Sequence, residues 1–159
     1  MRPDPVPIGV ALARTAKAAS AAFDAAMSKA GGSLPIWLVL LSLKTSRGAS
    51  QRSMAEAMGI QGATLTHHLN GMEAAGLVTR RRDPGNRRVH IVELTESGEE
   101  LFDKLRTVAV HFDERLRCGL SAGVLDEFRR VLDQLGNNVD ADVTPIPGWG
   151  PSDRVADQP

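Results

Sequence analysis

This chain of 159 residues has a single cysteine, no tyrosine and no recognisable catalytic motif. Its one cysteine, Cys118, excludes an internal disulfide and any site that needs several thiolate ligands. There is no tyrosine, no Ser/His/Asp spacing typical of a triad, and no glycine-rich loop that would cradle a phosphate. We therefore expect a protein that is not an enzyme and that uses no metal and no cofactor.

Long apolar runs are also missing. The longest one, over residues 34–43, falls far short of the roughly 20 residues that cross a bilayer, so no membrane partner is expected. Near the N-terminus, Arg14 and Lys17 interrupt an alanine-rich stretch, which does not fit a secretory signal. These features predict a cytoplasmic protein.

Charge is balanced in total but uneven along the chain. Nineteen basic and nineteen acidic side chains give a formal net charge of zero at pH 7. Residues 44–92 carry eight Lys or Arg and three acidic residues, whereas residues 93–159 carry seven and fourteen. A basic central segment beside an acidic one indicates a localised anion-binding face.

Apolar residues spaced by three and four positions predict helices at both ends of the chain. The first covers residues 8–30 and ends at Gly31 and Gly32; a second, largely buried helix follows Ser33. Thr95 and Ser121 are suited to cap two further helices, and Gly136 is expected to end the last one. Their apolar stripes are Leu101, Leu105, Val108, Phe112 and Leu116, and Leu125, Phe128, Leu132 and Leu135.

The middle of the chain predicts a winged helix-turn-helix. Two helices over residues 51–58 and 61–75, joined by a turn at Gly59, form the helix-turn-helix pattern. Residues 77–82 and 88–94 alternate as strands do, and residues 83–86, Asp-Pro-Gly-Asn, favour a turn between them. The expected fold is mainly α with a small β-hairpin wing.

Two sets of side chains in this segment are suited to DNA. The hairpin carries five arginines in nine residues; alternation places Arg80 and Arg82 on one face, with Arg81 on the other. Arg87 and Arg88 lie near its tip, where they could hold phosphates or enter a minor groove. The outer face of helix 61–75 is polar and uncharged, so it would not repel phosphates and could read bases. Its candidates are Gln61, Thr64, Thr66, His67, His68 and Asn70.

Plainer interpretations of both sets remain open, namely a solvated charged hairpin and an ordinary solvated helix face. A metal site at His67 and His68 is not expected, because neighbouring helical residues point about 100° apart.

The same residues resemble the MarR family of regulators. Glu73, Gly76 and the run Leu77-Val78-Thr79-Arg80 resemble the family pattern LE-x-x-GLV-x-R. Residues 84–88, Pro-Gly-Asn-Arg-Arg, resemble its wing pattern P-x-D-R-R, and residues 94–98 match LT-x-x-G. Met54-Ala55 stands where the family usually has Leu-Ala. These pieces lie in register over about fifty residues, and the resemblance extends from about residue 8 to residue 135.

The resemblance implies a homodimeric transcriptional regulator, more often a repressor, bound to a pseudo-palindromic operator in double-stranded DNA. Residues 1–33 and 95–136 would form a helical dimerisation region, residues 34–94 the DNA-binding domain, and residues 137–159 a flexible tail. A small aromatic or phenolic effector would weaken DNA binding, with Trp37, Phe23 and Met27 as candidate ligand contacts. The alternative is that these three residues simply belong to the core.

Two departures from the family pattern bear on DNA reading. Asn86 replaces the usual wing Asp, and His67 stands where many members place a base-reading arginine. Because histidine changes charge near neutral pH, His67 predicts a pH-dependent DNA affinity. Both departures keep a rival hypothesis open: a helical dimeric protein-interaction module whose winged helix no longer reads DNA.

Overall fold

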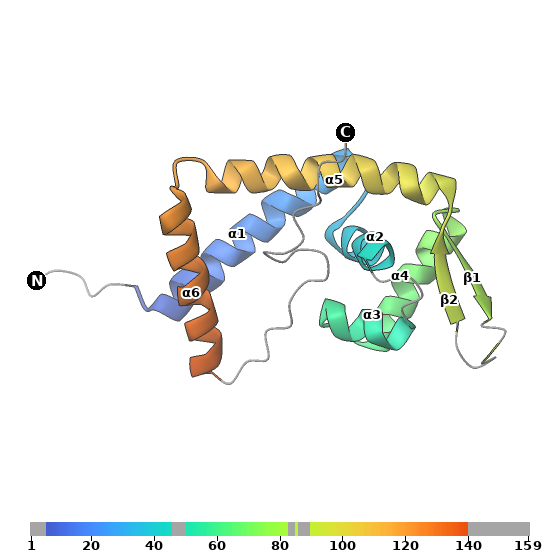
Figure 1. Ribbon diagram of the computed structural model, residues 1–159, viewed down its shortest axis with the longest axis horizontal. Helices are drawn as coiled ribbons and strands as arrows, with labels where there is room; N and C mark the ends of the chain where they lie inside the picture. The colour runs from blue at the N-terminus through green and yellow to red at the C-terminus, as the bar shows by residue number, and fades with distance from the viewer. Residues whose placement is uncertain (1–5, 46–49, 83–84, 86–89, 140–159) are drawn as a thin grey trace, which may run out of the picture.

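The computed structural model describes residues 6–45, 50–82, 85 and 90–139, and it confirms the predicted mainly helical fold with one small hairpin (Figure 1). Helix α5 runs along one side of the molecule. The helix-turn-helix and the hairpin lie under one end of α5, and α6 lies at the other end (Figure 1). The elements are α1 (Ile8–Lys29), α2 (Leu34–Thr45), α3 (Gln51–Met58), α4 (Gly62–Ala74), β1 (Val78–Arg82), β2 (His90–Leu94), α5 (Glu96–Arg117) and α6 (Ala122–Asn138).

Helix α2 forms the centre of the core. It is apolar on nearly all sides, as a helix surrounded by others must be. It contacts α3 and α4 on the helix-turn-helix side and also packs against α5. Trp37, Val39, Leu40, Leu41 and Leu43 are all buried, together with residues of α4, both strands and α5. Helix α2 therefore connects the helix-turn-helix to α5 by packing against both.

The predicted helix caps at Thr95 and Ser121 are confirmed, and Ser50 caps α3 in the same way. The hydroxyl groups of Ser50, Thr95 and Ser121 accept hydrogen bonds from the backbone N–H of Ser53, Gly98 and Val124 at 3.2, 3.1 and 3.4 Å. Each bond satisfies a backbone donor that the first turn of a helix otherwise leaves without a partner.

The hairpin is joined tightly to the elements on either side of it. Strands β1 and β2 are antiparallel, with Val78 opposite Leu94 and Arg82 opposite His90. At their base, the Thr95 hydroxyl donates to the carbonyl of Gly76 at 2.6 Å, and the Thr95 amide donates to Leu77 at 3.1 Å. A side chain on Gly98 would lie 2.1 Å from the carbonyl oxygen of Leu77, so only glycine fits there. Residues 94–98, which match LT-x-x-G, therefore connect the start of α5 to the backbone after α4 through hydrogen bonds and close packing.

Two details of the predicted helices are wrong. The buried face of α5 includes Phe102 and Ala109, which the predicted stripe omits. Contact with α2 causes this shift, since Phe102 stacks on Trp37. Helix α6 does not stop at Gly136 but continues through Asn138. A side-chain bond from Gln134 to Asn138 spans the glycine, whose cost in a helix is only about 1 kcal/mol.

A large apolar surface stays uncovered in the single chain. Helix α6 buries none of its residues and makes few contacts with the other described elements. Within the described residues, no single helix is long and apolar enough to cross a membrane; α1 and α2 reach that length and composition only when taken together, across a bend of 77°. The exposed apolar side chains on helices are Ile8, Val10 and Leu12 of α1, Val110 and Leu116 of α5, and Val124, Phe128, Val131 and Leu132 of α6.

Candidate nucleic-acid interface

Helix α4 is held on the surface of the core by one apolar stripe. Leu65, Leu69 and Met72 are at most 2% exposed, so the opposite side of the helix is directed to solvent. Gly59 makes the turn between α3 and α4 possible because its φ of 64° lies in the left-handed region, where a side chain is disfavoured. The sequence thereby presents α4 as a projecting second helix of a helix-turn-helix.

The predicted base-reading residues divide into three groups on α4. At about 100° per residue, His67 and Asn70 lie on the side away from the buried stripe and Thr64 at the edge of that side, and all three are exposed. Thr66 and His68 lie on the two flanks, and His68 is half-buried with its ring 5.9 Å from that of His67. Gln61 is the exposed N-cap residue.

Sequence analysis missed Ala63, which shares the outer face of α4. Ala63 lies four residues before His67, and this spacing places both residues on the same face of a helix. A methyl group there could contact a thymine methyl.

The hairpin arginines have different environments. Nε of Arg80 donates to Glu73 at 2.9 Å, and its Nη2 donates to Glu73 and, at 2.7 Å, to Asn70. Arg81 lies on the other face of the hairpin and pairs with Glu93 at 2.9 Å. Arg82, at the end of β1, is exposed. Alternation thus sorts these three arginines as predicted, whereas Arg87, Arg88 and Asn86 lie outside the described residues.

Both carboxylates of these pairs stay ionised at neutral pH. The hydrogen bonds and the positive charge of Arg80 lower the pKa of Glu73. Arg81 lowers the pKa of Glu93 in the same way. Each pair is therefore close to neutral as a unit, and much of the positive charge counted in this segment is compensated inside the protein.

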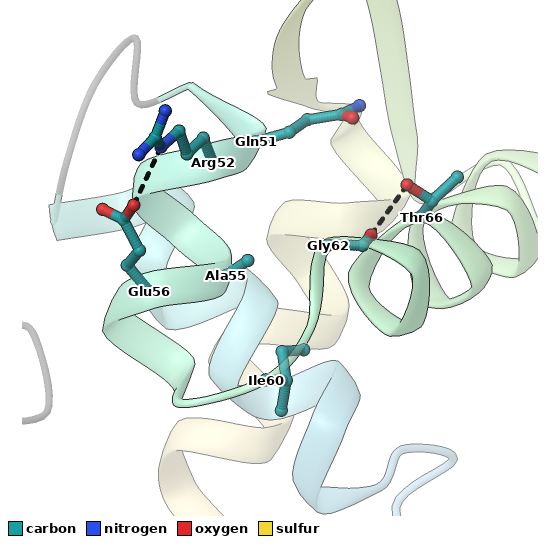
Figure 2. Close-up of a pocket in the computed structure, with 7 residues that line it drawn as sticks. All are labelled: Gln51, Arg52, Ala55, Glu56, Ile60, Gly62 and Thr66. Atoms are coloured by element: carbon teal, nitrogen blue, oxygen red, sulfur yellow. Dashed lines mark hydrogen bonds and ion pairs between the residues drawn. The ribbon is translucent and has the colours of Figure 1, made fainter.

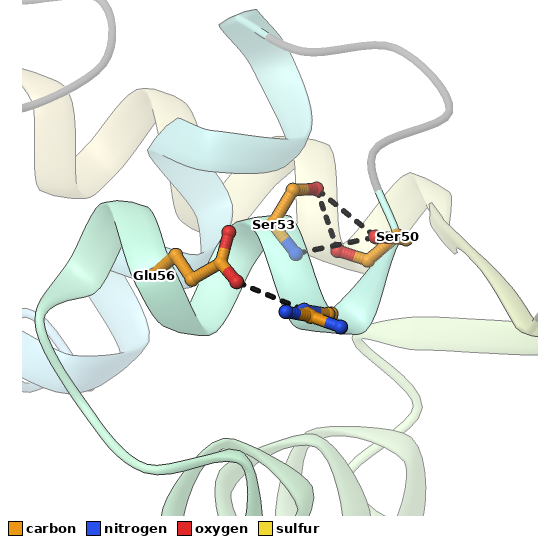
Figure 3. A network of polar contacts seen from close by, with 4 residues as sticks. Ser50, Ser53 and Glu56 are labelled. Atoms are coloured by element: carbon orange, nitrogen blue, oxygen red, sulfur yellow. Dashed lines mark hydrogen bonds and ion pairs between the residues drawn. The ribbon is translucent and has the colours of Figure 1, made fainter.

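An open cavity of about 380 Å³ lies between α3 and α4 (Figure 2). Gln51 and Arg52 line it from α3, and Thr66 lines it from α4, where its hydroxyl donates to the carbonyl of Gly62 at 2.9 Å. Arg52 also donates to Glu56 at 2.9 Å, next to the hydrogen-bonded hydroxyls of Ser50 and Ser53 (Figure 3). The sequence did not single out Gln51 or Arg52, since nothing in its pattern predicts a cavity.

The three candidate ligand contacts are packed within the subunit. Trp37 is 3% exposed and stacks on Phe102, with ring centroids 5.5 Å apart. Phe23 meets Phe112 edge to face at 5.1 Å, and Met27 is fully buried. They lie where α1 and α2 meet α5. Their aromatic neighbours are Phe102, which the predicted stripe of α5 omitted, and Phe112, which it included.

Metal-binding side chains do not gather in the part of the chain that the structure describes, where no group of three or more His, Cys, Asp or Glu is arranged to hold an ion. Cys118 is an exposed free thiol at the C-terminal end of α5.

Comparison with known proteins identifies regulators. The MarR family model matches residues 33–90, which span α2, α3, α4 and β1 and reach the start of β2. The regulator YdgJ of Bacillus subtilis is 31% identical over 98 residues, and the chain spans 58% of its length. The HTH-type transcriptional repressor Rv2887 of Mycobacterium tuberculosis is 29% identical over 135 residues, which are 85% of this chain and 97% of that protein.

Solved structures agree in fold. The complex of Rv2887 with salicylic acid has a TM-score of 0.63 at 29% identity and covers 84% of this chain and 98% of that one. The repressor CouR of Rhodococcus jostii, bound to a 23-mer DNA duplex, has a TM-score of 0.72 at 26% identity and covers 84% and 92%.

Proposed function

Since this chain belongs to the MarR family of transcriptional regulators, we propose that it is a homodimeric repressor of a pseudo-palindromic site in double-stranded DNA. One observation carries the proposal. The outer face of α4 holds Thr64, His67 and Asn70, all exposed and none acidic, and Arg82 at the end of β1 is exposed as well. An α-helix fits the major groove, where amide, hydroxyl and imidazole groups can read base edges.

A second copy of the chain is the partner that the uncovered apolar surface favours. Exposed apolar side chains on the outer part of α1, the end of α5 and the length of α6 form a surface far from the helix-turn-helix. Apolar patches of this extent usually mark an interface. A two-fold dimer would place two α4 helices about 34–36 Å apart, one turn of DNA.

The DNA proposal is tested by fluorescence anisotropy with the full chain, labelled DNA from its own upstream region and scrambled DNA of the same composition. Selective binding should weaken with salt, at a slope in log affinity against log salt of about −0.9 per phosphate neutralised. Arg82→Ala should lower affinity about tenfold and flatten this slope by about one per subunit.

Arg106→Ala, at an exposed position of α5, is the matched control and should leave both affinity and slope unchanged. Equal, weak binding to the two DNAs, together with the same result for fragments drawn from the whole genome, would contradict the proposal and favour a protein-interaction module.

We further propose that a small aromatic acid releases the protein from DNA. The relative Rv2887 has been crystallised with salicylic acid, and in this chain Trp37 and Phe102 stack where α2 meets α5. A ligand that separates these rings would move the helix-turn-helix relative to α5. An allosteric coupling of this kind typically changes affinity 5- to 150-fold, or about 1–3 kcal/mol.

Tryptophan fluorescence tests this effector proposal. The chain has two tryptophans, so Trp149→Phe leaves Trp37 as the only one. Salicylate should quench Trp37 in a saturable way and weaken DNA binding at least about fivefold over the same concentration range. Benzenesulfonamide, an uncharged aromatic of similar size, is the control for non-specific quenching. Unchanged emission and unchanged DNA affinity at saturating salicylate would refute this effector class.

A further inference from the structure

We propose that Arg80 is a positioning residue: through Glu73 and Asn70 it fixes the hairpin against the end of α4, and it is not itself a phosphate contact. The inference rests on the proposed DNA-binding function and assigns Arg80 a role different from the one that its place in the basic hairpin suggests.

The guanidinium of Arg80 adds a side-chain link between two elements that also meet through the apolar core and through the backbone hydrogen bonds of the turn. Arg80 lies in the middle of β1, whereas Asn70 and Glu73 lie one turn apart on the last part of α4. Nε and Nη2 both donate to one carboxylate oxygen of Glu73, and Nη2 also donates to Asn70. Bonds between charged groups are roughly twice as strong as neutral ones, so this is the strongest polar link between α4 and β1 among the described residues.

Burial separates Arg80 from its neighbour in the hairpin. The side chain of Arg80 is 21% exposed, but that of Arg81 is 52% exposed. Register explains the difference: Arg80 lies opposite Val92, which is buried, and shares the inner face of the hairpin with Val78. A guanidinium held there and neutralised by Glu73 adds little to the attraction for phosphate.

The bonds that Arg80 makes to Glu73 and Asn70, called the clamp below, matter because a small rotation at the base of the hairpin displaces the end of β1 by several ångströms. Each strand residue adds about 3.3 Å, so the end of β1 lies about 13 Å from Val78. A tilt of about 20° about Val78 would move Arg82 by about 5 Å, enough to break a hydrogen bond with a phosphate. Arg80 also holds Oδ1 of Asn70, which directs the Nδ2 donors of that amide away from the clamp and prepares them for an acceptor on a base edge.

The decisive variant is Glu73→Gln, because the two possible roles of Arg80 predict opposite changes in DNA affinity. If Arg80 positions the hairpin, losing the carboxylate weakens binding to the selected DNA site about tenfold. If Arg80 contacts a phosphate, the same change frees its charge, removes an acidic group and tightens binding. Arg80→Lys separates the roles again, since lysine keeps the charge but not the fork of donors. The clamp predicts about a tenfold loss for it, and a phosphate contact predicts near-normal affinity.

Glu93→Gln is the matched control, since it removes the carboxylate paired with Arg81 on the other face of the same hairpin. It should leave affinity unchanged or slightly raised. Tighter binding by Glu73→Gln, or full affinity of Arg80→Lys, would overturn the proposal.

A second measurement needs no DNA, so it distinguishes failure of the clamp from failure of the proposed function. The amides of Leu77 and Thr95, bonded to Met72 and Leu77, join the hairpin to α4. Their hydrogen exchange should be about fivefold faster in Glu73→Gln and Arg80→Lys but not in Glu93→Gln, with the amide of the fully buried Leu105 unchanged as a reference for global stability. Equal exchange at Leu77 and Thr95 in all four proteins would refute the clamp even if no DNA site is found.

Discussion

Phe128→Glu is expected to convert the protein to monomers and to abolish tight, selective DNA binding. Phe128 is 54% exposed on α6, a helix that buries none of its residues, and Val124, Val131 and Leu132 surround it. Burying one phenylalanine contributes about 1.5–3 kcal/mol, and a two-fold interface contains the residue twice. A buried carboxylate would cost still more, because the neighbouring side chains of Val124, Val131 and Leu132 are apolar and cannot pair with its charge.

The expected effect is therefore at least a 100-fold rise in the dimer dissociation constant, or about 2.7 kcal/mol. Light scattering after gel filtration over a range of concentrations measures it. DNA affinity should fall by about 100-fold or more as well, because each α4 then binds its half-site without the gain in effective concentration that a linked partner gives. The control is Asn137→Glu, which introduces the same charge at an exposed position on the opposite side of α6 from Phe128. A Phe128→Glu protein that stays dimeric and binds DNA normally would show that α6 is not in the interface.

Gly98→Ala is expected to destabilise the fold by about 3 kcal/mol although it adds a single methyl group. That methyl would lie 2.1 Å from the carbonyl oxygen of Leu77 and 3.3 Å from a side-chain atom of Leu94. The first contact is with backbone, so either the first turn of α5 or the turn before β1 must shift. A shift would also weaken the bonds that Thr95 makes to Gly76 and Leu77. The gain of up to about 1 kcal/mol in helix propensity does not offset this.

Thermal unfolding at one fixed protein concentration measures the effect, since the melting temperature of a dimer depends on concentration. A loss of about 3 kcal/mol corresponds to a drop in Tm of roughly 6–12 °C for a chain of this length. Gly123→Ala in the first turn of α6 is the matched control, because a methyl group there meets nothing within 4 Å. It should leave Tm unchanged or raise it slightly. An equally small effect of both substitutions would contradict the close approach at Gly98.

Local rules explain why much of this fold could be predicted from sequence. A hydroxyl before a helix caps it, as at Ser50, Thr95 and Ser121, and a glycine such as Gly59 permits a left-handed turn. Strand alternation sorted Arg80 from Arg81 because that period depends only on backbone geometry. None of these inferences requires knowledge of what is distant in sequence.

The features that could not be predicted depend on distant partners. Helix periodicity placed Leu101 in the α5 stripe, and Leu101 does pack against the core, but the stripe did not include Phe102, which stacks on Trp37. The charge of Arg80 suggested a DNA contact, yet Glu73 lies seven residues earlier on another element, and pairing between them follows only from how β1 folds back on α4.

The most direct test of the account is a hydroxyl-radical footprint of the purified full-length protein on genomic fragments that it selects from its source organism. A homodimer with one α4 in each major groove predicts an inverted repeat shared by the selected fragments. It also predicts protection in two patches centred 10–10.5 base pairs, or a whole number of such turns, apart. Selected fragments without a common repeat, bound as weakly as random DNA and without a periodic footprint, would contradict the central claim that this chain reads DNA as a symmetric dimer.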